Sequence, residues 1–326
     1  MDKEKLIEEI SNIININAAQ LFFVLKKDNT YTIKLADLES GMTQSSIAEM
    51  FGGYIQSNLI ENENLFVGSL SVDDERENAI YLYDYDEYSD ELEIIRDFKI
   101  VDPDDINQQA ITFEHFNFND DNLSNLYGFI ITYGSMQNNI ILFKKFYPIS
   151  LIKRDAYLLG AVKSSSRFKK IDENDILRIN GKFELLKIHN YLYVLDIKCI
   201  ENNLKFKKRI KKDADNLIEA IKKIDILDDI ETISELKDDN STLRKLSKAS
   251  KSSPILNSGK SKEDIMSFIK KDPKISSKFK YNEDGSKLRL DTKKAKNEFL
   301  KLLQDSFLNS GLTDIMYDVK TKDVME

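Results

Sequence analysis

The chain has 326 residues, of which 41% are hydrophobic, with 48 Lys/Arg against 56 Asp/Glu and a formal net charge of −8. This length is sufficient for two domains with their own cores, and no run of ~20 apolar residues predicts a transmembrane helix. The single cysteine, Cys199, excludes an internal disulfide and a cysteine-rich zinc site, and only two histidines are present. We therefore expect no metal, no cofactor and a reducing, cytoplasmic location.

The charge is distributed unevenly along the chain. Residues 1–150 carry 10 basic against 27 acidic residues, a net of −17, whereas 151–326 carry 38 against 29, a net of +9. Within the second half, Arg244–Lys301 holds 17 basic against 7 acidic residues, a net of +10. Because an average charge conceals such a local field, this basic segment is the first candidate for function.

The first half is rich in predicted strands. Leu6, Ile7, Ile10 and Ile13 recur at helical spacing and predict a helix over 2–15. A second helix is expected over 42–61, broken at Gly52-Gly53. Strands are expected at 21–27, 31–36, 65–71, 79–85, 92–98, 126–132, 140–147, 176–179, 183–188 and 191–198. The turns between them have hairpin length, so the pattern predicts a largely antiparallel sheet.

The pattern becomes helical after about Lys207. Ser261 and Asp264 form an approximate capping box, Asp284-Gly285 predicts a hairpin turn, and Ser247–Lys262 is a low-complexity stretch expected to be mobile. The helices are expected at 214–224, 230–237, 241–252, 262–271 and 292–307. The chain is thus predicted to be α+β, with a β-rich antiparallel N-terminal half and a helical C-terminal half with one inserted β-hairpin. The expected domains are an acidic one over 1–205 and a basic one over 206–326.

The basic segment offers a set of candidate DNA contacts on three elements. Lysines outnumber arginines in it, which favours sequence-independent contact with phosphates over base reading. Alternatively, these side chains only solvate amphipathic helices, or pair with the acidic first half or an acidic partner. The candidate DNA-binding residues are Arg244, Lys245, Lys248 and Lys251 on one helix, Lys287 and Arg289 on the hairpin, and Lys293, Lys294 and Lys296 at the start of the last helix.

A metal-dependent nuclease is the alternative reading. Asp196 and Lys198 form an acid-x-Lys pair on the predicted strand 191–198, with Asp172 and Asp175 upstream. Acidic groups that hold Mg²⁺ beside a lysine could activate a water, so Asp175, Asp196 and Lys198 are the alternative catalytic set. The same pair also arises by chance on an exposed strand. We therefore assign no catalytic residue.

The acidic clusters of the first half match no calcium-binding loop. Residues 73–75, 84–87 and 102–105 lack the central glycine and terminal glutamate of the twelve-residue pattern. They are interpreted as a solvated face. Such a face could also dock a basic partner or fold back over the basic segment, which would make the chain an interaction subunit that does not bind DNA.

Several stretches resemble the KwaB family, the soluble component of the two-gene Kiwa anti-phage defence system. The C-terminal ones are a short strand at 288–290, a lysine-rich helix start at 292–296, Leu-Leu-x-Asp at 302–305, residues 310–313, and Tyr317, Val319 and Lys322. Residues 243–256, 263–275 and 168–197 are similar to that family's helical and β segments. The resemblance extends through most of 165–322 and more loosely into the first half.

The resemblance implies a function and partners. A member of this family is expected to be a cytoplasmic DNA-binding effector that acts on phage DNA. It is also expected to form a homodimer and to be recruited to the inner face of the cell membrane by a small multi-spanning membrane protein. None of the matched residues marks a DNA contact or a catalytic group, so the candidate residues rest on charge and placement.

Overall fold

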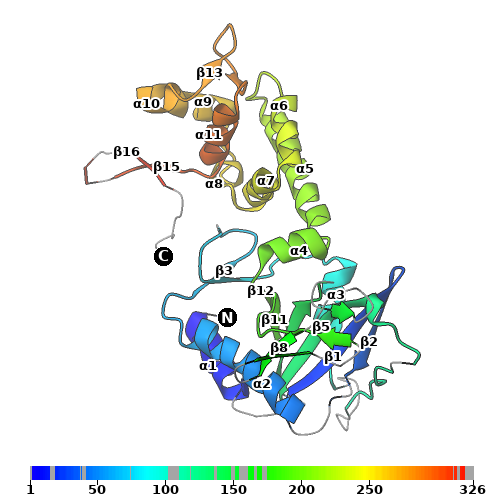
Figure 1. Cartoon of the computed structure of the whole chain (residues 1–326). Coiled ribbons are helices and arrows are strands. Elements are labelled where there is room, and N and C mark those ends of the chain that lie inside the picture. The colour runs from blue at the N-terminus through cyan, green and yellow to red at the C-terminus, as the bar shows by residue number, and fades with distance from the viewer. Residues whose placement is uncertain are drawn as a thin grey trace. The chain divides into compact units, whose positions relative to one another are not determined.

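The computed structural model of the chain divides into two compact units. The sheet unit comprises Met1–Gly68, Arg76–Tyr83 and Asp90–Leu204, and the helical unit comprises Ser69–Glu75, Asp84–Ser89 and Lys205–Glu326. Figure 1 shows the elements of both units. The structure describes residues 2–14, 19–36, 38, 42–73, 75–101, 110–117, 119–135, 138–147, 151–153, 161–164, 167–170, 175–310, 312–313 and 316–319. None of the helices in these ranges has the length and apolar content that a bilayer span requires.

The sheet unit is built on eight strands in the order β2-β1-β5-β6-β11-β12-β4-β3. The six pairings from β2 to β4 are all antiparallel, which confirms the predicted fold class. The strands are β1 (Ala19–Lys27), β2 (Thr30–Leu35), β3 (Phe66–Ser69), β4 (Ala79–Leu82), β5 (Leu126–Gly134), β6 (Asn139–Lys145), β11 (Leu185–Ile188) and β12 (Tyr191–Val194). Two separate strand pairs are β7 (Leu151–Lys153) with β10 (Asp175–Leu177), and β8 (Ala161–Ser164) with β9 (Arg167–Lys170).

Five consecutive residues of strand β1 are buried. Because successive side chains point to opposite faces of a sheet, β1 is buried on both faces. Leu21 and Phe23 belong to the main core, in which helices α1 (Lys3–Ile14) and α2 (Met42–Ile55) cover one face of the sheet (Figure 1). Phe22 points to the opposite face, where its ring centroid lies 5.2 Å from that of Phe98. The remaining helices of this unit are the π-helix η1 (Gln56–Ile60), α3 (Asp90–Asp97), the 3₁₀-helix η2 (Leu123–Asn125) and α4 (Ile197–Asn203).

The expected break at Gly52-Gly53 is wrong, since α2 passes through both glycines and continues into the π-helix. Gly52 faces the sheet, where a Cβ atom would lie 3.8 Å from the Tyr133 hydroxyl. That hydroxyl donates a hydrogen bond to the carbonyl oxygen of Ala48. Phe51 and Ile55, on either side of the two glycines, are buried in the main core, so packing against the sheet holds the helix through them.

Two predicted strands are also corrected. Residues 92–98 form the end of helix α3 and the residue after it, because Leu92 and Ile95 are buried at helical spacing and acidic residues fill the first turn. The strand expected at 191–198 ends at Val194. Asp196 is the N-cap of α4, which places Lys198 on a helix. A run of β-branched and aromatic residues predicted the strand correctly but did not locate its end.

The helical unit contains every helix expected after Lys207, with shifted ends. Helix α5 (Lys207–Ile224) packs on α7 (Asn240–Ser252), and Leu217 and Leu246 are part of this buried interior. The other elements are α6 (Glu231–Ser234), the 3₁₀-helix η4 (Glu235–Asp238), α8 (Pro254–Asn257), α9 (Lys262–Lys271), α10 (Pro273–Ser276), α11 (Lys293–Leu303), and strands β13 (Lys280–Tyr281), β14 (Leu288–Arg289), β15 (Phe307–Asn309) and β16 (Met316–Asp318).

Local signals in this unit predicted its details well. The capping box of Ser261 and Asp264 is present, and β13 pairs with β14 around Gly285, whose φ is +70°. The low-complexity stretch was misread as mobile. Ser247 and Ser253 within it are fully buried, and the Ser253 hydroxyl donates to the carbonyl oxygen of Leu303 at 2.5 Å. Small hydroxyl side chains permit close helix packing here.

Two glycines are expected to respond oppositely to alanine. Gly134 has φ +102°, and a Cβ atom there would lie 2.7 Å from Ile13 Cγ2, so Gly134→Ala should lower the free energy of unfolding by about 1–3 kcal/mol. Gly53 is exposed inside α2 with no atom near its added Cβ, so Gly53→Ala should raise it by about 0.5–1 kcal/mol. Urea unfolding followed by circular dichroism measures both, and a destabilised Gly53→Ala would contradict the continuous helix.

Candidate nucleic-acid interface

Some of the basic side chains on helix α7 already contact other side chains of the helical unit. Asp239 caps this helix by accepting a hydrogen bond from the Thr242 amide. The Arg244 guanidinium lies 2.7 Å from Glu75 Oε2, and Lys251 Nζ lies 4.1 Å from the centroid of the Tyr85 ring. Lys248 is half-buried, whereas Lys245 is exposed. The helix therefore presents Lys245 as an exposed cation, whereas Arg244 and Lys251 contact residues of the segments 69–75 and 84–89.

The hairpin places two lysines on one carboxylate. Lys287 Nζ lies 2.6 Å from Asp225 Oδ1, and Lys262 Nζ lies 3.4 Å from Asp225 Oδ2. The hydrogen bond from Lys287 lowers the pKa of Asp225, which stays ionised at neutral pH. Two ammonium groups against one carboxylate leave a net positive charge at this point. Arg289 has its own partner in Asp291, at 3.2 Å.

The start of α11 carries the least compensated charge. Thr292 is the N-cap and accepts a hydrogen bond from the Ala295 amide at 3.1 Å. Lys293 and Lys294 in the first turn are exposed, and within the described ranges no carboxylate pairs with either. Lys296 does have one, Glu235, at 2.6 Å. Positive charges at a helix N-terminus oppose the helix dipole, so a nearby anion would relieve an unfavourable arrangement.

The nine predicted residues thus fall into three groups. Arg244, Lys287, Arg289 and Lys296 are each ion-paired with a carboxylate of the same unit. Lys245, Lys293 and Lys294 are exposed and make no ion pair with any described residue, while Lys248 and Lys251 lie between these extremes. Only the second group keeps its charge available without breaking a contact.

Further exposed lysines of the helical unit were not among the predicted contacts. The run Lys207–Lys212 begins α5, and its sequence, KKRIKK, was the signal that could have drawn attention to it. Five further lysines, on α5, α9, α10 and β13, are exposed, and no described carboxylate pairs with their ammonium groups. They are Lys208, Lys211, Lys271, Lys274 and Lys280.

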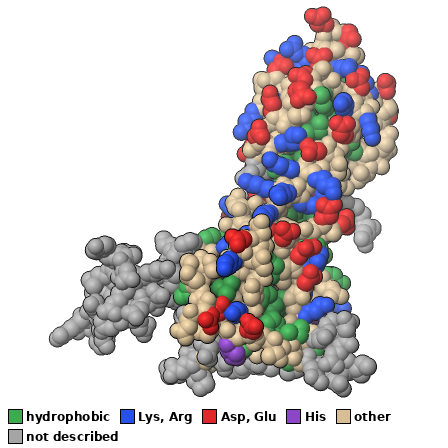
Figure 2. Space-filling view, turned by 90° about the vertical axis from the view of Figure 1, so that its right-hand side faces the viewer, with side chains coloured by type: hydrophobic (Ala, Val, Ile, Leu, Met, Phe, Trp, Pro, Cys, Tyr) green, Lys and Arg blue, Asp and Glu red, His purple; other side chains and the backbone are tan. Residues whose placement is uncertain are grey.

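Acidic residues of the first half neutralise part of the basic segment. The stretches 69–75 and 84–89 belong to the helical unit, where Glu75 pairs with Arg244. Glu87 pairs with Lys212, and this hydrogen bond lowers the pKa of Glu87. Figure 2 accordingly shows basic and acidic side chains interleaved over the helical unit on the face in view. On that face the surface has mixed charge.

The alternative catalytic residues lie on separate elements of the described structure. The Asp196 carboxylate accepts a hydrogen bond from the Cys199 amide at 2.9 Å, as expected for a helix cap. Lys198 is exposed on α4, Asp175 begins β10, and Asp172 lies outside the described residues. Within the described ranges no three His, Cys, Asp or Glu side chains gather as metal ligands would. Burial raises the pKa of the Cys199 thiol to about 12, so it stays protonated.

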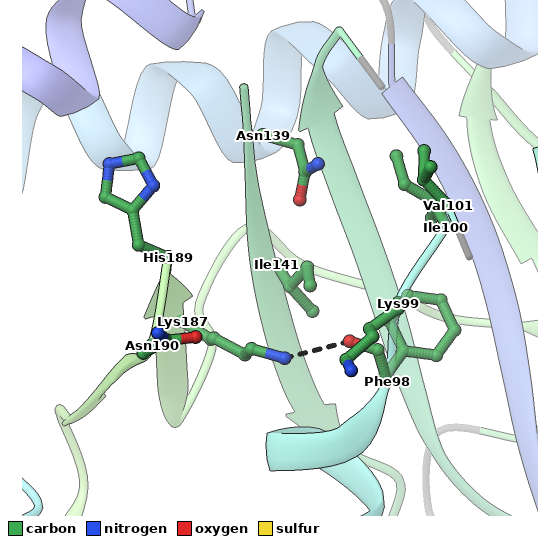
Figure 3. Close-up of a pocket in the computed structure, with 9 residues that line it drawn as sticks. All are labelled: Phe98, Lys99, Ile100, Val101, Asn139, Ile141, Lys187, His189 and Asn190. Atoms are coloured by element: carbon green, nitrogen blue, oxygen red, sulfur yellow. Dashed lines mark hydrogen bonds between the residues drawn. The ribbon is translucent and has the colours of Figure 1, made fainter. Parts of the chain in front are cut away.

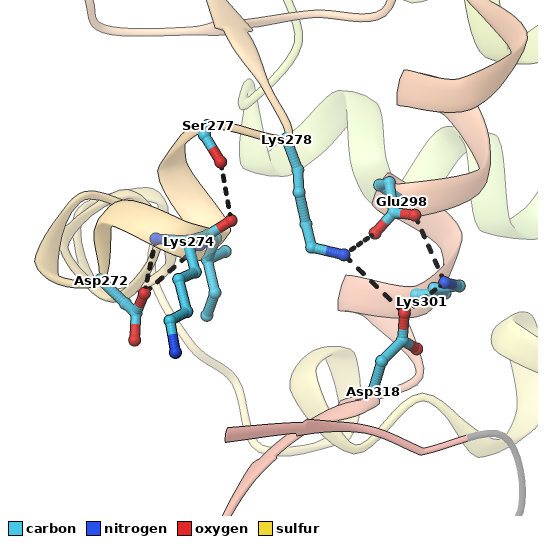
Figure 4. Close-up of polar contacts among 8 residues, drawn as sticks. Asp272, Lys274, Ser277, Lys278, Glu298, Lys301 and Asp318 are labelled. Atoms are coloured by element: carbon cyan, nitrogen blue, oxygen red, sulfur yellow. Dashed lines mark hydrogen bonds and ion pairs between the residues drawn. The ribbon is translucent and has the colours of Figure 1, made fainter. Parts of the chain in front are cut away.

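The C-terminal hairpin β15–β16 is joined to α11 by four charged groups (Figure 4). Lys278 Nζ lies 2.7 Å from Glu298 Oε2 and 3.7 Å from Asp318 Oδ2. Lys301 Nζ lies 2.6 Å from Asp318 Oδ2 and 3.3 Å from Glu298 Oε1. Two cations and two anions balance in this network, so Lys278 and Lys301 are structural and not candidate phosphate contacts.

Comparison with known proteins places the chain in a family. The family model described as Kiwa protein KwaB-like matches residues 123–313. The Kiwa protein KwaB of Escherichia coli O55:H7 (strain RM12579 / EPEC) is 28% identical over 327 residues, which cover 100% of both chains. No solved structure matches. The chain belongs to the KwaB-like family of the Kiwa system, as its sequence predicted, and this membership implies a role in anti-phage defence.

The ion network should tie the C-terminal hairpin to α11 in a pH-dependent way. Asp318→Asn removes two ion pairs and should destabilise the helical unit by up to about 1 kcal/mol, because the group is partly exposed. The hydrogen bond from Lys301 lowers the pKa of Asp318 below 3.8. Its contribution is therefore complete above pH 3.8 and is lost as the pH falls through the lower, folded-state value.

Urea unfolding and amide exchange of β15 measure this effect. The control is Glu219→Gln, which removes a surface pair of 4.0 Å between two exposed side chains and should change neither quantity. An equal effect of the two substitutions, or a difference from the wild type that persists unchanged below pH 3.8, would contradict the role given to Asp318.

Proposed function

We propose that this chain is a sequence-nonspecific DNA-binding effector of the Kiwa system that contacts DNA through its helical unit. The observation that carries the proposal is the set of exposed lysines without carboxylate partners among the described residues. These lysines lie on α5, α7, α9, α10 and α11. The resemblance to the KwaB family further supports action on phage DNA, as a homodimer held by a multi-spanning membrane partner.

Lys245, Lys293 and Lys294 are the primary contacts in this proposal. A lysine ammonium is a compact point charge that neutralises a phosphate and releases a condensed counterion, without reading a base. At Lys293 and Lys294 the backbone amides of the first helical turn add to the attraction. These three side chains can bind a phosphate without first leaving a carboxylate.

Arg244, Lys248, Lys251, Lys287, Arg289 and Lys296 are secondary contacts. Those with a carboxylate partner must exchange it for a phosphate, and the exchange of one surface pair for another gains little free energy. Binding that uses few lysines and no base edges should be weak at physiological salt. A locally high DNA concentration, or a second copy of the chain, would then be needed for stable binding.

The interaction-subunit hypothesis is favoured by one observation, namely that four of the nine predicted contacts are already ion-paired within the unit. In that case the lysines only keep the helices solvated. A gel-shift series over DNA length and salt separates the two functions, since an interaction subunit would not bind DNA even at low salt.

The double substitution Lys293→Gln/Lys294→Gln tests the primary contacts. It should reduce the slope of log affinity against log salt by about 1–2, taking roughly 0.9 per lost phosphate contact. The matched control is Lys5→Gln/Lys27→Gln, which removes two exposed lysines of the sheet unit and should leave the slope unchanged. Fluorescence anisotropy with double-stranded DNA of two unrelated sequences gives both slopes. A decrease of equal size in the control would sink the assignment.

A gain of affinity is expected when a partner carboxylate is removed. Glu235→Gln frees Lys296 from its 2.6 Å ion pair, so DNA affinity at fixed salt should rise and the salt slope should steepen by up to about 0.9. Glu219→Gln makes the same charge change at a pair of 4.0 Å between exposed groups and serves as the control. If Glu235→Gln and Glu219→Gln raise affinity equally, only net charge matters and Lys296 is not a contact.

A further inference from the structure

The sheet unit contains a pocket that the DNA-binding proposal does not use. Its volume is about 370 Å³, and it lies between the segment after α3, strand β6 and the end of β11 (Figure 3). Small-molecule sites in proteins have volumes from about 300 Å³ upward. The pocket is therefore large enough for a small ligand and too small for a DNA duplex.

Lys187 is the least expected side chain in this pocket. In β11 the flanking Leu186 and Ile188 point into the main core, so alternation directs Lys187 to the opposite face. It is 8% exposed, and its ammonium donates hydrogen bonds to the carbonyl oxygens of Arg96 and, at 2.9 Å, Phe98. No carboxylate within the described ranges forms an ion pair with it. A buried cation without a counter-ion is costly, so the fold retains an unfavourable charge here.

The other polar groups of the pocket have the same sign or are neutral. Lys99 and His189 join Lys187 in the lining, and no lining residue is acidic. Of these three side chains, His189 has a carboxylate partner among the described residues, because its Nε2 lies 3.1 Å from Glu9 Oε2. The two lysines stand out because residues 1–150, which supply much of the unit, have a net charge of −17.

The rest of the lining divides into an apolar wall and two amides. Phe98, Ile100 and Ile141 form the wall, and Figure 3 shows Ile141 between the Lys187 side chain and Asn139. Asn190 offers a hydrogen-bond donor and an acceptor, whereas the Asn139 amide nitrogen already donates to the carbonyl oxygen of Ser135 at 3.4 Å. An apolar surface with a few converging polar groups is typical of a site for a small organic molecule.

We propose that this pocket binds a small organic phosphate of the size of a nucleoside monophosphate. The phosphate accepts hydrogen bonds from Lys99, Lys187 and His189 and neutralises the charge of the two lysines. The planar base packs on Ile100 and Ile141, and Asn190 forms hydrogen bonds with its polar edge. This site lies in the sheet unit, on side chains other than the proposed DNA contacts, so the two proposals can fail independently.

Proton uptake provides a second readout of phosphate binding near Lys187. Burial, and then the nearby Lys99, lower the pKa of Lys187 to about 8, with Arg96 acting in the same direction and Asp97 against it. An anion beside the ammonium raises this pKa again, so at pH 8 binding should take up protons. His189 and its partner Glu9 are the remaining titratable groups at this pocket.

Isothermal titration calorimetry on the full chain tests the proposal with adenosine, guanosine, cytidine and uridine 5′-monophosphates. At least one of these nucleotides should bind. The nucleoside with the same base, and inorganic phosphate alone, should each bind with an affinity lower by about tenfold or more. Lys99→Gln and His189→Asn should each weaken binding by about tenfold, and asparagine tolerates the φ of +51° at position 189. Lys27→Gln, an exposed lysine of the same unit, is the control and should bind as the wild type does.

The same titrations at pH 8 in two buffers of different ionisation enthalpy report the protons taken up. Equal heats in the two buffers would overturn the placement of the phosphate beside Lys187. No binding of any nucleotide, equal binding of inorganic phosphate, or a loss of affinity in Lys27→Gln as large as in Lys99→Gln would overturn the proposed ligand class. None of these results depends on whether the helical unit binds DNA.

Discussion

The balance between lysines and carboxylates in the helical unit is the constraint on which the functional account depends. Asp225 is shared by Lys262 and Lys287, and Glu75 neutralises Arg244, whereas Lys293 and Lys294 keep their full charge at a helix start. Many side chains of a basic segment can thus form ion pairs within the fold. The affinity of the segment for a polyanion then comes from the cations that have no such partner.

Much of the fold could be predicted from the sequence because its signals are local. A run of β-prone residues predicted β1, the capping box at Ser261 predicted the start of α9, and Asp284-Gly285 predicted the hairpin. Predictions failed where a tertiary contact decided the outcome. Gly53 looked like a helix break, but Phe51 and Ile55 on either side of it pack in the main core, and the helix continues.

The candidate site was harder to predict than the fold. Charge alone identified the lysines of α7 and α11, but it could not show that Glu75 and Glu235, distant in the sequence from their partners, would pair with Arg244 and Lys296. The pocket of the sheet unit was missed for a similar reason. Lys187 reads as one polar residue in a strand, and only the sheet shows that it is buried without a carboxylate partner in the described structure.

The salt dependence of DNA binding by the unmodified chain tests the central claim most directly. With Lys245, Lys293 and Lys294 as the minimum set of phosphate contacts, log affinity should fall against log salt with a slope of about −2.7 or steeper, at roughly 0.9 per contact. The slope should be the same for unrelated DNA sequences. Absence of binding at low salt, or an affinity that salt does not change, would contradict a function based on uncompensated lysines.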